Sequence, residues 1–105
     1  MPQFSVYKNK NAATKARVPY LLDIQSNLLS ELETRVVVPL YAATAVKGKA
    51  LTVLTPIFEI EGKEYVAMTP QLAGISKKEL GAEVAELAAR RGTIIAALDF
   101  LITGI

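Results

Sequence analysis

The last dozen residues of the chain, 94–105, form a strongly apolar stretch whose spacing predicts a helix. At 100° per residue, Asp99 and Thr103 lie together on one side of it, with Phe100 beside them. Five aliphatic side chains share the opposite stripe: Ile94, Ile95, Leu98, Leu101 and Ile102. We expect the core of so short a chain to leave part of this helix uncovered, where it would contact another protein.

The preceding residues carry the patterns of short strands. Residues 35–40 form a β-branched run without alternation, which predicts a strand buried on both faces, and Pro39 near its end indicates a bulge or a sheet edge. Glu61-Gly62 separates two apolar segments and predicts a hairpin turn, although Pro56 interrupts the first segment. Strands are thus expected at residues 4–7, 20–25, 35–40, 53–60 and 63–68.

Residues 72–87 are ambiguous between strand, turn and helix. Leu80, Val84 and Leu87 keep helical spacing, but the glycines at positions 74 and 81 weaken any continuous helix. Gly92 either separates this segment from the terminal helix or is tolerated inside it. Five or more strands followed by one C-terminal helix predict a mostly β fold, a small antiparallel barrel-like sheet with the helix packed on it.

The composition predicts one compact globular domain over residues 1–105, with 51% hydrophobic and 21% charged residues. The net charge of +2 is too small to demand nucleic acid as a partner. Its distribution is uneven: residues 1–50 carry seven Lys or Arg against three Asp or Glu, a net of +4, and residues 51–105 carry five against seven, a net of −2. The basic excess lies largely in Lys8, Lys10, Lys15 and Arg17, which we interpret as a solvated polar loop rather than a phosphate-binding patch.

The residue types that the chain lacks restrict its chemistry. It has no Cys and no His, which excludes disulfides, thiolate nucleophiles, imidazole bases and metal sites built from His or Cys. Glu79, Glu83 and Glu86 recur at helical spacing near basic residues, and we interpret them as surface charge with i,i+4 pairing. No catalytic residue, cofactor or metal is therefore predicted. Because the N-terminus lacks an apolar signal core and no apolar run reaches membrane-spanning length, we expect a cytoplasmic protein without membrane contact.

Several short motifs follow one another along the chain. They are Gln3-Phe4-x-Val6-Tyr7, Asp23-Ile24-Gln25-Ser26, Arg35-Val36-Val37-Val38-Pro39-Leu40, a hairpin with Pro56 and Ile60, Met68-Thr69, Glu83-Val84-Ala85-x-Leu87 and the terminal Gly104-Ile105. No single motif is specific. Their ordered combination, with length and spacing kept, resembles the CcdB family over essentially the whole chain.

The resemblance implies a fold, an activity and partners together. Members of the CcdB family have an SH3-like barrel, with an antiparallel sheet plus a small second sheet, and form two-fold homodimers. They are the toxin half of a bacterial toxin–antitoxin pair with a role in plasmid maintenance. They poison DNA gyrase by binding its A subunit and trapping the enzyme on cleaved DNA, so they act by binding, are not enzymes and make no direct specific contact with DNA. The antitoxin neutralises the toxin through a disordered C-terminal tail that folds on it.

Carried over residue by residue, the resemblance gives five gyrase-facing candidates: Leu28, Asp99, Thr103, Gly104 and Ile105. Four residues lie close to that surface in the family: Gln3, Phe4, Tyr7 and Ser26. Several of these also have a purely structural interpretation. Gly104 fits the left-handed residue that ends a helix, and Ser26 fits the N-cap of a short turn. Asp99 fits a solvated residue or a hydrogen-bonding group at a dimer interface. The antitoxin-binding residues are not identified.

The chain departs from the best-known family pattern at two helix positions. That pattern ends in Trp-Gly-Ile, and its indole packs on a gyrase arginine, whereas this chain has Thr103; the usual Asn is replaced by Asp99. A Trp–Arg contact at an interface contributes about 0.5–2 kcal/mol. We hypothesise that the Asp99 carboxylate, on the same face as Thr103, pairs with that arginine instead, in a charge-assisted hydrogen bond that contributes about 1.5–3 kcal/mol.

Two alternatives remain open. The same barrel serves endoribonuclease toxins, which need a catalytic arginine and a basic groove; Arg35 is available, but it falls within the CcdB-like strand motif and no aromatic residues interleave with basic ones around it. The chain could also be a non-toxic dimeric relative that acts as an interaction module. Toxicity that is lost on gyrase mutation favours the poison, and RNA cleavage by the purified protein favours the ribonuclease.

Overall fold

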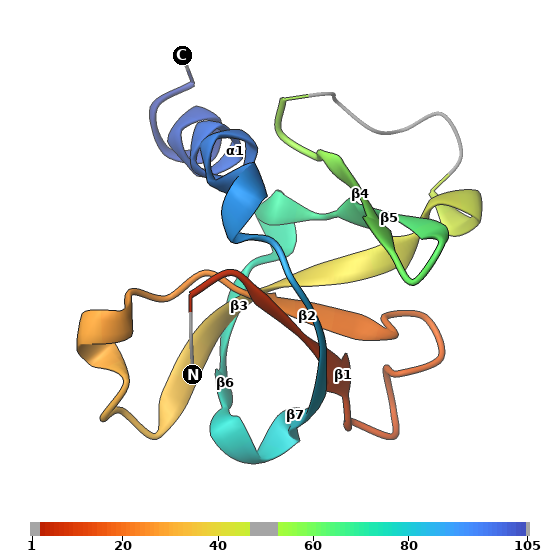
Figure 1. The fold of residues 1–105 in the computed structure, drawn as a ribbon, viewed down its shortest axis with the longest axis vertical. Helices are drawn as coiled ribbons and strands as arrows, with labels where there is room; N and C mark the ends of the chain where they lie inside the picture. Colours follow the sequence, from red (N-terminus) through yellow and green to blue (C-terminus); the bar gives the residue numbers. More distant parts are fainter. Residues whose placement is uncertain (1–2, 47–52, 105) are drawn as a thin grey trace.

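β3 (Thr34–Ala42) is the longest of the described strands and organises the fold (Figure 1). The computed structural model describes residues 3–46 and 53–104. The other strands are β1 (Ser5–Asn9), β2 (Tyr20–Asp23), β4 (Ile57–Ile60), β5 (Lys63–Ala67), β6 (Ala73–Ser76) and β7 (Leu80–Glu86), and they are followed by the helix α1 (Arg91–Thr103). Short 3-10 turns lie between them: η1 (Asn27–Leu29), η2 (Ala43–Ala45), η3 (Thr69–Gln71), η4 (Lys77–Glu79) and η5 (Ala88–Arg90).

The strand pairings are antiparallel, and β3 pairs with three other strands. On one side β3 pairs with β2; on the other its first half pairs with β6 and its end with β5. The seven strands form one curled sheet, a half-barrel, in the order β4-β5-β3-β2-β1-β7, with β6 also paired to β3. The strands β4 and β5 continue this sheet and do not form a separate second one. The half-barrel confirms the predicted mostly β fold with the character of an SH3-like barrel and one C-terminal helix.

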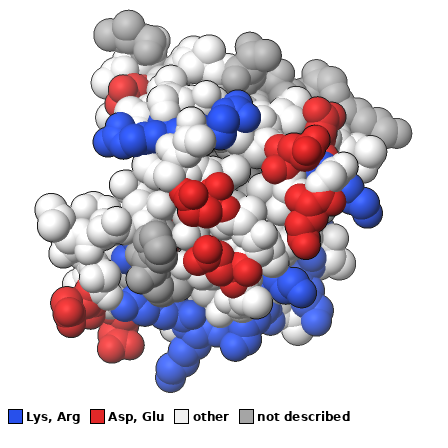
Figure 2. Space-filling model, in the orientation of Figure 1, with Lys and Arg blue, Asp and Glu red and all other residues white. Residues whose placement is uncertain are grey.

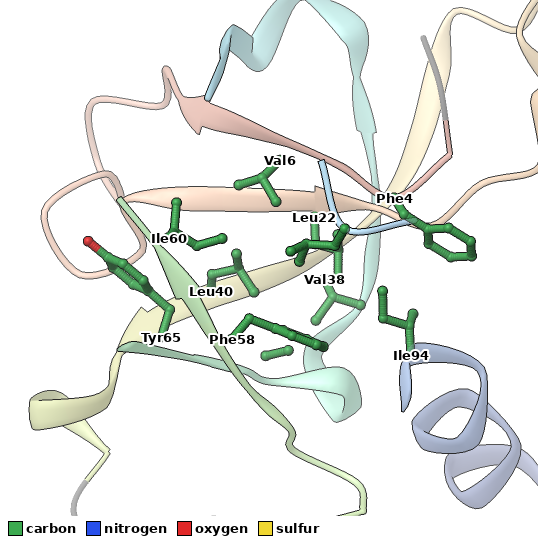
Figure 3. Packing of buried hydrophobic residues seen from close by; sticks show 11 residues of the cluster. Phe4, Val6, Leu22, Val38, Leu40, Phe58, Ile60, Tyr65 and Ile94 are labelled. Carbon is green, nitrogen blue, oxygen red and sulfur yellow. The ribbon is translucent and has the colours of Figure 1, made fainter. Parts of the chain in front are cut away.

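The central strands of the half-barrel are buried on both faces, which confirms the prediction for residues 35–40. Val38 points into a core beneath α1, together with Phe58 and Ile94 (Figure 3). Its neighbour Val37 points into a second cluster on the opposite face, whose other buried members are Tyr7, Val18, Leu21 and Leu80. Burying one such aliphatic side chain stabilises the fold by about 1.5–3 kcal/mol. The strands β1, β2 and β3 therefore contribute to two cores, one on each face of the sheet. For this reason residues 35–40 do not alternate between apolar and polar side chains.

Pro39 lies within β3 without the predicted bulge or sheet edge. The pairing with β2 runs regularly through it, with Pro39 opposite Leu21. Its missing N–H falls between the last β6 pair, Val37 with Ala73, and the first β5 pair, which involves Leu40. Met68, directly after β5, donates its N–H to the Pro39 carbonyl at 3.0 Å, so position 39 lacks only the return hydrogen bond at the end of that ladder.

The ambiguous residues 72–87 form two strands rather than a helix. β7 pairs with β1, with Tyr7 opposite Glu83, and this long-range pairing outweighs the weak helical tendency of a segment that contains Gly81. The predicted i,i+4 pairing is therefore wrong, because the three glutamates lie on a turn and a strand: Glu79, Glu83 and Glu86. A glycine fits position 81 because a Cβ there would lie 3.1 Å from the carbonyl oxygen of Lys8 on the neighbouring strand.

The remaining boundaries follow local backbone chemistry. The hairpin turns at Glu61-Gly62 as predicted, and both residues have left-handed φ angles of 52° and 83°. β4 begins at Ile57, directly after Pro56, and not at position 53 as predicted, because residues 53–55 form a turn. Gly92 is tolerated inside α1, near its start.

Candidate functional site

The C-terminal end of α1 projects from the body of the protein and exposes much of its apolar surface (Figure 1). Ile94 and Ala97, nearer its start, are buried against the half-barrel. Phe100 and Leu101 are 37% and 36% exposed, and Ile102 is 79% exposed. The helix is therefore anchored at one end and presents apolar side chains to solvent at the other.

Asp99, Thr103 and Gly104 come together at this exposed end. The Thr103 hydroxyl donates a hydrogen bond to the backbone carbonyl of Asp99 at 2.7 Å. Gly104 has a left-handed φ of 73°, and its N–H donates to the carbonyl of Phe100 at 2.9 Å. This confirms that Gly104 ends the helix, in a conformation that is strained for any other residue. Ile105 lies outside the described residues.

A second exposed apolar patch surrounds η1, the turn that follows β2. Ser26 caps this turn, since its Oγ accepts a hydrogen bond from the N–H of Leu28 at 3.1 Å. Leu28 is 93% exposed, and Leu29 and Leu32 are each 48% exposed. We call Leu28, Leu29 and Leu32 the η1 patch. So short a turn cannot bury these leucines itself, and they remain exposed to solvent.

The N-terminal segment is joined to the η1 turn and to the end of β2 by hydrogen bonds. The backbone N–H of Gln3 donates to Asn27 Oδ1 at 2.6 Å, and its Nε2 donates to the carbonyl of Ile24 at 3.0 Å. Phe4, with a φ of 71°, and Tyr7 are buried in the first and second core respectively. Burial also raises the pKa of the Tyr7 hydroxyl above its usual value. Phe4 and Tyr7 therefore act on the surface only by positioning the segments that form it.

A buried ion pair, which the sequence motifs did not reveal as such, connects the strands to η1. Arg35 Nε lies 2.8 Å from Asp23 Oδ2 and Arg35 Nη2 lies 3.0 Å from Oδ1, and both side chains are fully buried. Gln25 extends this network, because its carbonyl accepts from Arg35 at 3.1 Å and its Oε1 accepts from the N–H of Val36 at 2.9 Å. Its Nε2 then donates to the carbonyl of Leu29 at 3.1 Å. The η1 patch is thus held in place by hydrogen bonds that reach into the centre of the sheet.

The two exposed regions lie on different parts of the molecule (Figure 1). Figure 1 shows η1 as the orange turn at the side of the molecule and the end of α1 at its top. The structure therefore brings Asp99, Thr103 and Gly104 together and leaves Leu28 on a separate projection.

Neither a metal site nor a membrane span is found in the described ranges. Within residues 3–46 and 53–104, no three acidic side chains are grouped so that they could hold a metal ion. Over the same part of the chain, no helix combines the length and the apolar character that crossing a bilayer requires.

Comparison with protein-family models gives a match over residues 3–104 to the family described as CcdB protein. The matched range includes the half-barrel, the η1 patch and the described length of α1. Membership of that family supports, in general terms, a toxin of a toxin–antitoxin pair that is directed at gyrase. The chain belongs to the CcdB family.

Proposed function

We propose that this protein is a cytoplasmic toxin that binds the A subunit of DNA gyrase through the end of α1 and traps gyrase on cleaved DNA. It acts by binding, without a cofactor and without catalysis of its own. Leu28, Asp99, Thr103, Gly104 and Ile105 form its gyrase-binding surface. A cognate antitoxin neutralises it through a disordered tail that folds on the toxin.

The exposed apolar end of α1 is the observation that carries this proposal. Monomeric proteins bury most large aliphatic side chains, yet Ile102 is 79% exposed on a helix whose other end is fixed by Ile94 and Ala97. A rigid helix that projects apolar side chains resembles the helix-in-groove mode of recognition. The left-handed Gly104 then sets the direction in which the chain leaves the helix.

Asp99 is the residue through which we expect this chain to replace the aromatic contact of its relatives. Its side chain is exposed, and among the described residues its carboxylate has no hydrogen bond or ion pair. The Thr103 hydroxyl is directed to the Asp99 backbone carbonyl and not to its carboxylate. The carboxylate therefore remains available for an arginine of gyrase, in a charge-assisted hydrogen bond.

A homodimer fits the two separate apolar projections. One protomer places Leu28 apart from the end of α1, so a surface that includes both requires either a large partner or a second copy of the chain. A two-fold axis near the half-exposed Phe100 and Leu101 would cover these side chains and duplicate the gyrase-facing ends.

The ribonuclease alternative is weakened by the burial of Arg35. A catalytic arginine must contact the RNA phosphate, but the Arg35 side chain is 0% exposed and bound to Asp23. The non-toxic dimeric relative has no specific observation in its favour, and the experiment below distinguishes it from the poison.

A gyrase DNA-cleavage assay tests the proposal directly. Purified protein is incubated with gyrase, supercoiled plasmid and ATP, beside a variant that lacks residues 103–105. A Glu59→Gln variant, altered at an exposed position of β4, serves as the matched control. We expect linear, protein-linked DNA with the full chain and with the control, and none with the truncated chain.

Each other result has a defined meaning. If neither the full chain nor the control produces linear DNA near the solubility limit, the proposal is wrong and the fold assignment stands. If the truncated chain is as active as the full chain, gyrase is poisoned through another surface. RNA cleavage by the purified protein would favour the ribonuclease.

A further inference from the structure

A cleft of about 320 Å³ opens on the face of the half-barrel opposite α1. Its floor consists of Leu21, Val37 and Pro39, which alternate with the residues that face the core beneath the helix. Ala73 and Ile75 of β6 form one wall, and the loop between β1 and β2, including Arg17, forms the other. We call this space the β6 cleft. Its volume reaches the range in which ligand side chains or small molecules are bound.

The polar rim of the β6 cleft is held in a fixed arrangement. Asn11 Nδ2 donates to Glu79 Oε1 at 2.9 Å, which joins the β1–β2 loop to the turn after β6. At the other end, the Tyr41 hydroxyl donates to Gln71 Oε1 at 2.6 Å. Because these groups already satisfy one another, a ligand would meet a preformed cleft with an apolar floor.

β6 also has a free edge along this cleft. It pairs with β3 on one side, and in the described part of the chain no strand pairs with its other side. Val36 directs its N–H to Gln25 and its carbonyl to Ile24, away from β6. Gly74, directly opposite Val36, therefore directs its own N–H and carbonyl outward, by the alternation of an antiparallel ladder. Gly74 is exposed, and nothing lies within 4 Å of the position of an added Cβ.

Two charged residues of opposite sign line the β6 cleft, and the loop beside it adds further basic residues. Arg17 lines the cleft, Lys10 and Lys15 lie on the same loop, and Glu79, which is bound to Asn11, is the one acidic residue among those that line it. Among residues 3–46 and 53–104, none of these three cations has an ion pair. In Figure 2, basic side chains gather along the lower edge of the molecule, where Figure 1 places the β1–β2 loop and the turn between β6 and β7.

We propose that the β6 cleft binds an extended, acidic peptide segment of a partner protein, which adds as a strand to the free edge of β6. The peptide residue opposite Gly74 forms the backbone hydrogen bonds. Its two neighbours then point to the same side as Ala73 and Ile75 and place apolar side chains in the cleft. An acidic residue of the peptide pairs with Arg17. This inference is independent of gyrase binding, since the cleft and the end of α1 lie on opposite sides of the sheet.

The test uses the full-length protein labelled with ¹⁵N and a set of synthetic ten-residue peptides. Each peptide carries two glutamates and two of Val, Ile, Leu or Phe placed two positions apart; scrambled peptides place the apolar residues next to each other. We expect the first set to bind with a dissociation constant on the order of 10–100 μM and to shift the amide resonances of Gly74 and Ile75. The scrambled peptides should bind at least about tenfold more weakly.

Two substitutions at one position isolate the strand pairing. Gly74→Pro removes the outward N–H, which an edge strand tolerates, and we expect at least about tenfold weaker binding. Gly74→Ala keeps the N–H and fills open space, so it should bind like the unaltered chain. Arg17→Glu changes an exposed loop residue and should weaken binding and remove its sensitivity to salt, even if Gly74→Pro disturbs the fold.

Three results would overturn the proposal. They are no binding by any peptide up to about 1 mM, equal binding by the Gly74→Pro and Gly74→Ala variants when both are folded, or equal binding by the scrambled peptides. Gyrase-dependent DNA cleavage is measured beside the titrations. It should be the same for Gly74→Ala, Gly74→Pro and the unaltered chain, so a failure of gyrase poisoning remains distinguishable from a failure of peptide binding.

Discussion

The Asp23–Arg35 pair and the end of α1 are unusual in opposite ways. The pair places charges in the protein interior, and the helix end places apolar side chains on the surface. The first places two charged side chains where exposure is 0%, and the second places Ile102 where exposure is 79%. The buried charges find their partners within the chain, because Arg35 Nε and Nη2 donate to the Asp23 carboxylate and Nη2 also donates to the Gln25 carbonyl. Within residues 3–46 and 53–104, nothing covers the apolar side chains of the exposed helix end to a comparable degree.

The comparison separates structure from function. A group that finds its partners within the protein is needed for folding, and its removal should act on stability. An exposed side chain without a partner inside the protein is available to bind another protein. Its removal should weaken binding while the free energy of unfolding stays nearly constant. Four substitutions test this separation, from the largest expected effect to the smallest.

Arg35→Met should destabilise the protein by about 3–5 kcal/mol, because it leaves the Asp23 carboxylate buried without its counter-charge. Urea unfolding followed by circular dichroism measures the change. The double variant Asp23→Leu with Arg35→Met removes both charges and should regain most of the lost stability. A single variant as stable as the unaltered protein would contradict the structural role of the pair.

Leu28→Ala should show the opposite behaviour. The side chain is 93% exposed, so the free energy of unfolding should change by less than about 0.5 kcal/mol. If Leu28 is an anchor for gyrase, affinity should fall by about 2 kcal/mol, roughly thirtyfold. Surface plasmon resonance with immobilised gyrase A subunit gives the affinity. A loss of stability without a loss of affinity would reverse the assignment.

Asp99→Asn should weaken gyrase binding by about 1–2 kcal/mol, since it exchanges a charge-assisted hydrogen bond for a neutral one. The loss should shrink at high salt, where the charged interaction is screened. Titration of gyrase at two salt concentrations measures both effects, with Glu59→Gln as the control. An unchanged affinity at low salt refutes the proposed replacement of the aromatic contact.

Tyr20→Phe should have the smallest effect, a destabilisation of about 0.5–1.5 kcal/mol. Its hydroxyl donates to Glu61 Oε1 at 3.1 Å, and burial together with this hydrogen bond raises the pKa of Tyr20 to about 12. Because the folded-state pKa lies above the ordinary value of 10.0, the stabilisation is fully present below pH 10 and is lost as the pH rises through 12.

The Tyr20 prediction is checked by unfolding curves between pH 9 and pH 12. The unaltered protein should lose stability more steeply over the upper part of this range than the Tyr20→Phe variant. Parallel curves for the two proteins would show that the hydroxyl of Tyr20 does not titrate in contact with the fold. Tyr7 is present in both and cancels in the comparison.

Local patterns were sufficient for the elements that depend on local chemistry. Glu61-Gly62 specified its turn, Ser26 its cap and Gly104 the end of α1, because each works within four residues of itself. Residues 80–86 were not recognised as a strand, because their partner β1 lies about 75 positions earlier in the chain.

The buried ion pair shows a different limit. Asp23 lies on the same face of β2 as Leu21, and a charged side chain on a buried face requires a partner of opposite charge. This signal was present in the sequence, but it does not say which cation pairs with Asp23. Arg35 is selected only by the register that places Asp23 opposite Val37, two residues along the same strand. The gyrase-facing residues came from the family resemblance alone and stay predictions.

The pairing of β3 with three other strands restricts how the length of this chain can vary. One residue inserted between Val37 and Leu40 would shift the pairing with β5 by one position relative to the pairing with β6, and would turn the β3 side chains on one side of the insertion to the opposite face. Apolar side chains of β3 would then be lost from both hydrophobic cores. The loop between β1 and β2 takes part in no strand pairing, and lengthening a surface connection costs about a few tenths of a kcal/mol. Insertions and deletions among natural variants of this protein should therefore collect in that loop and avoid the nine residues of β3.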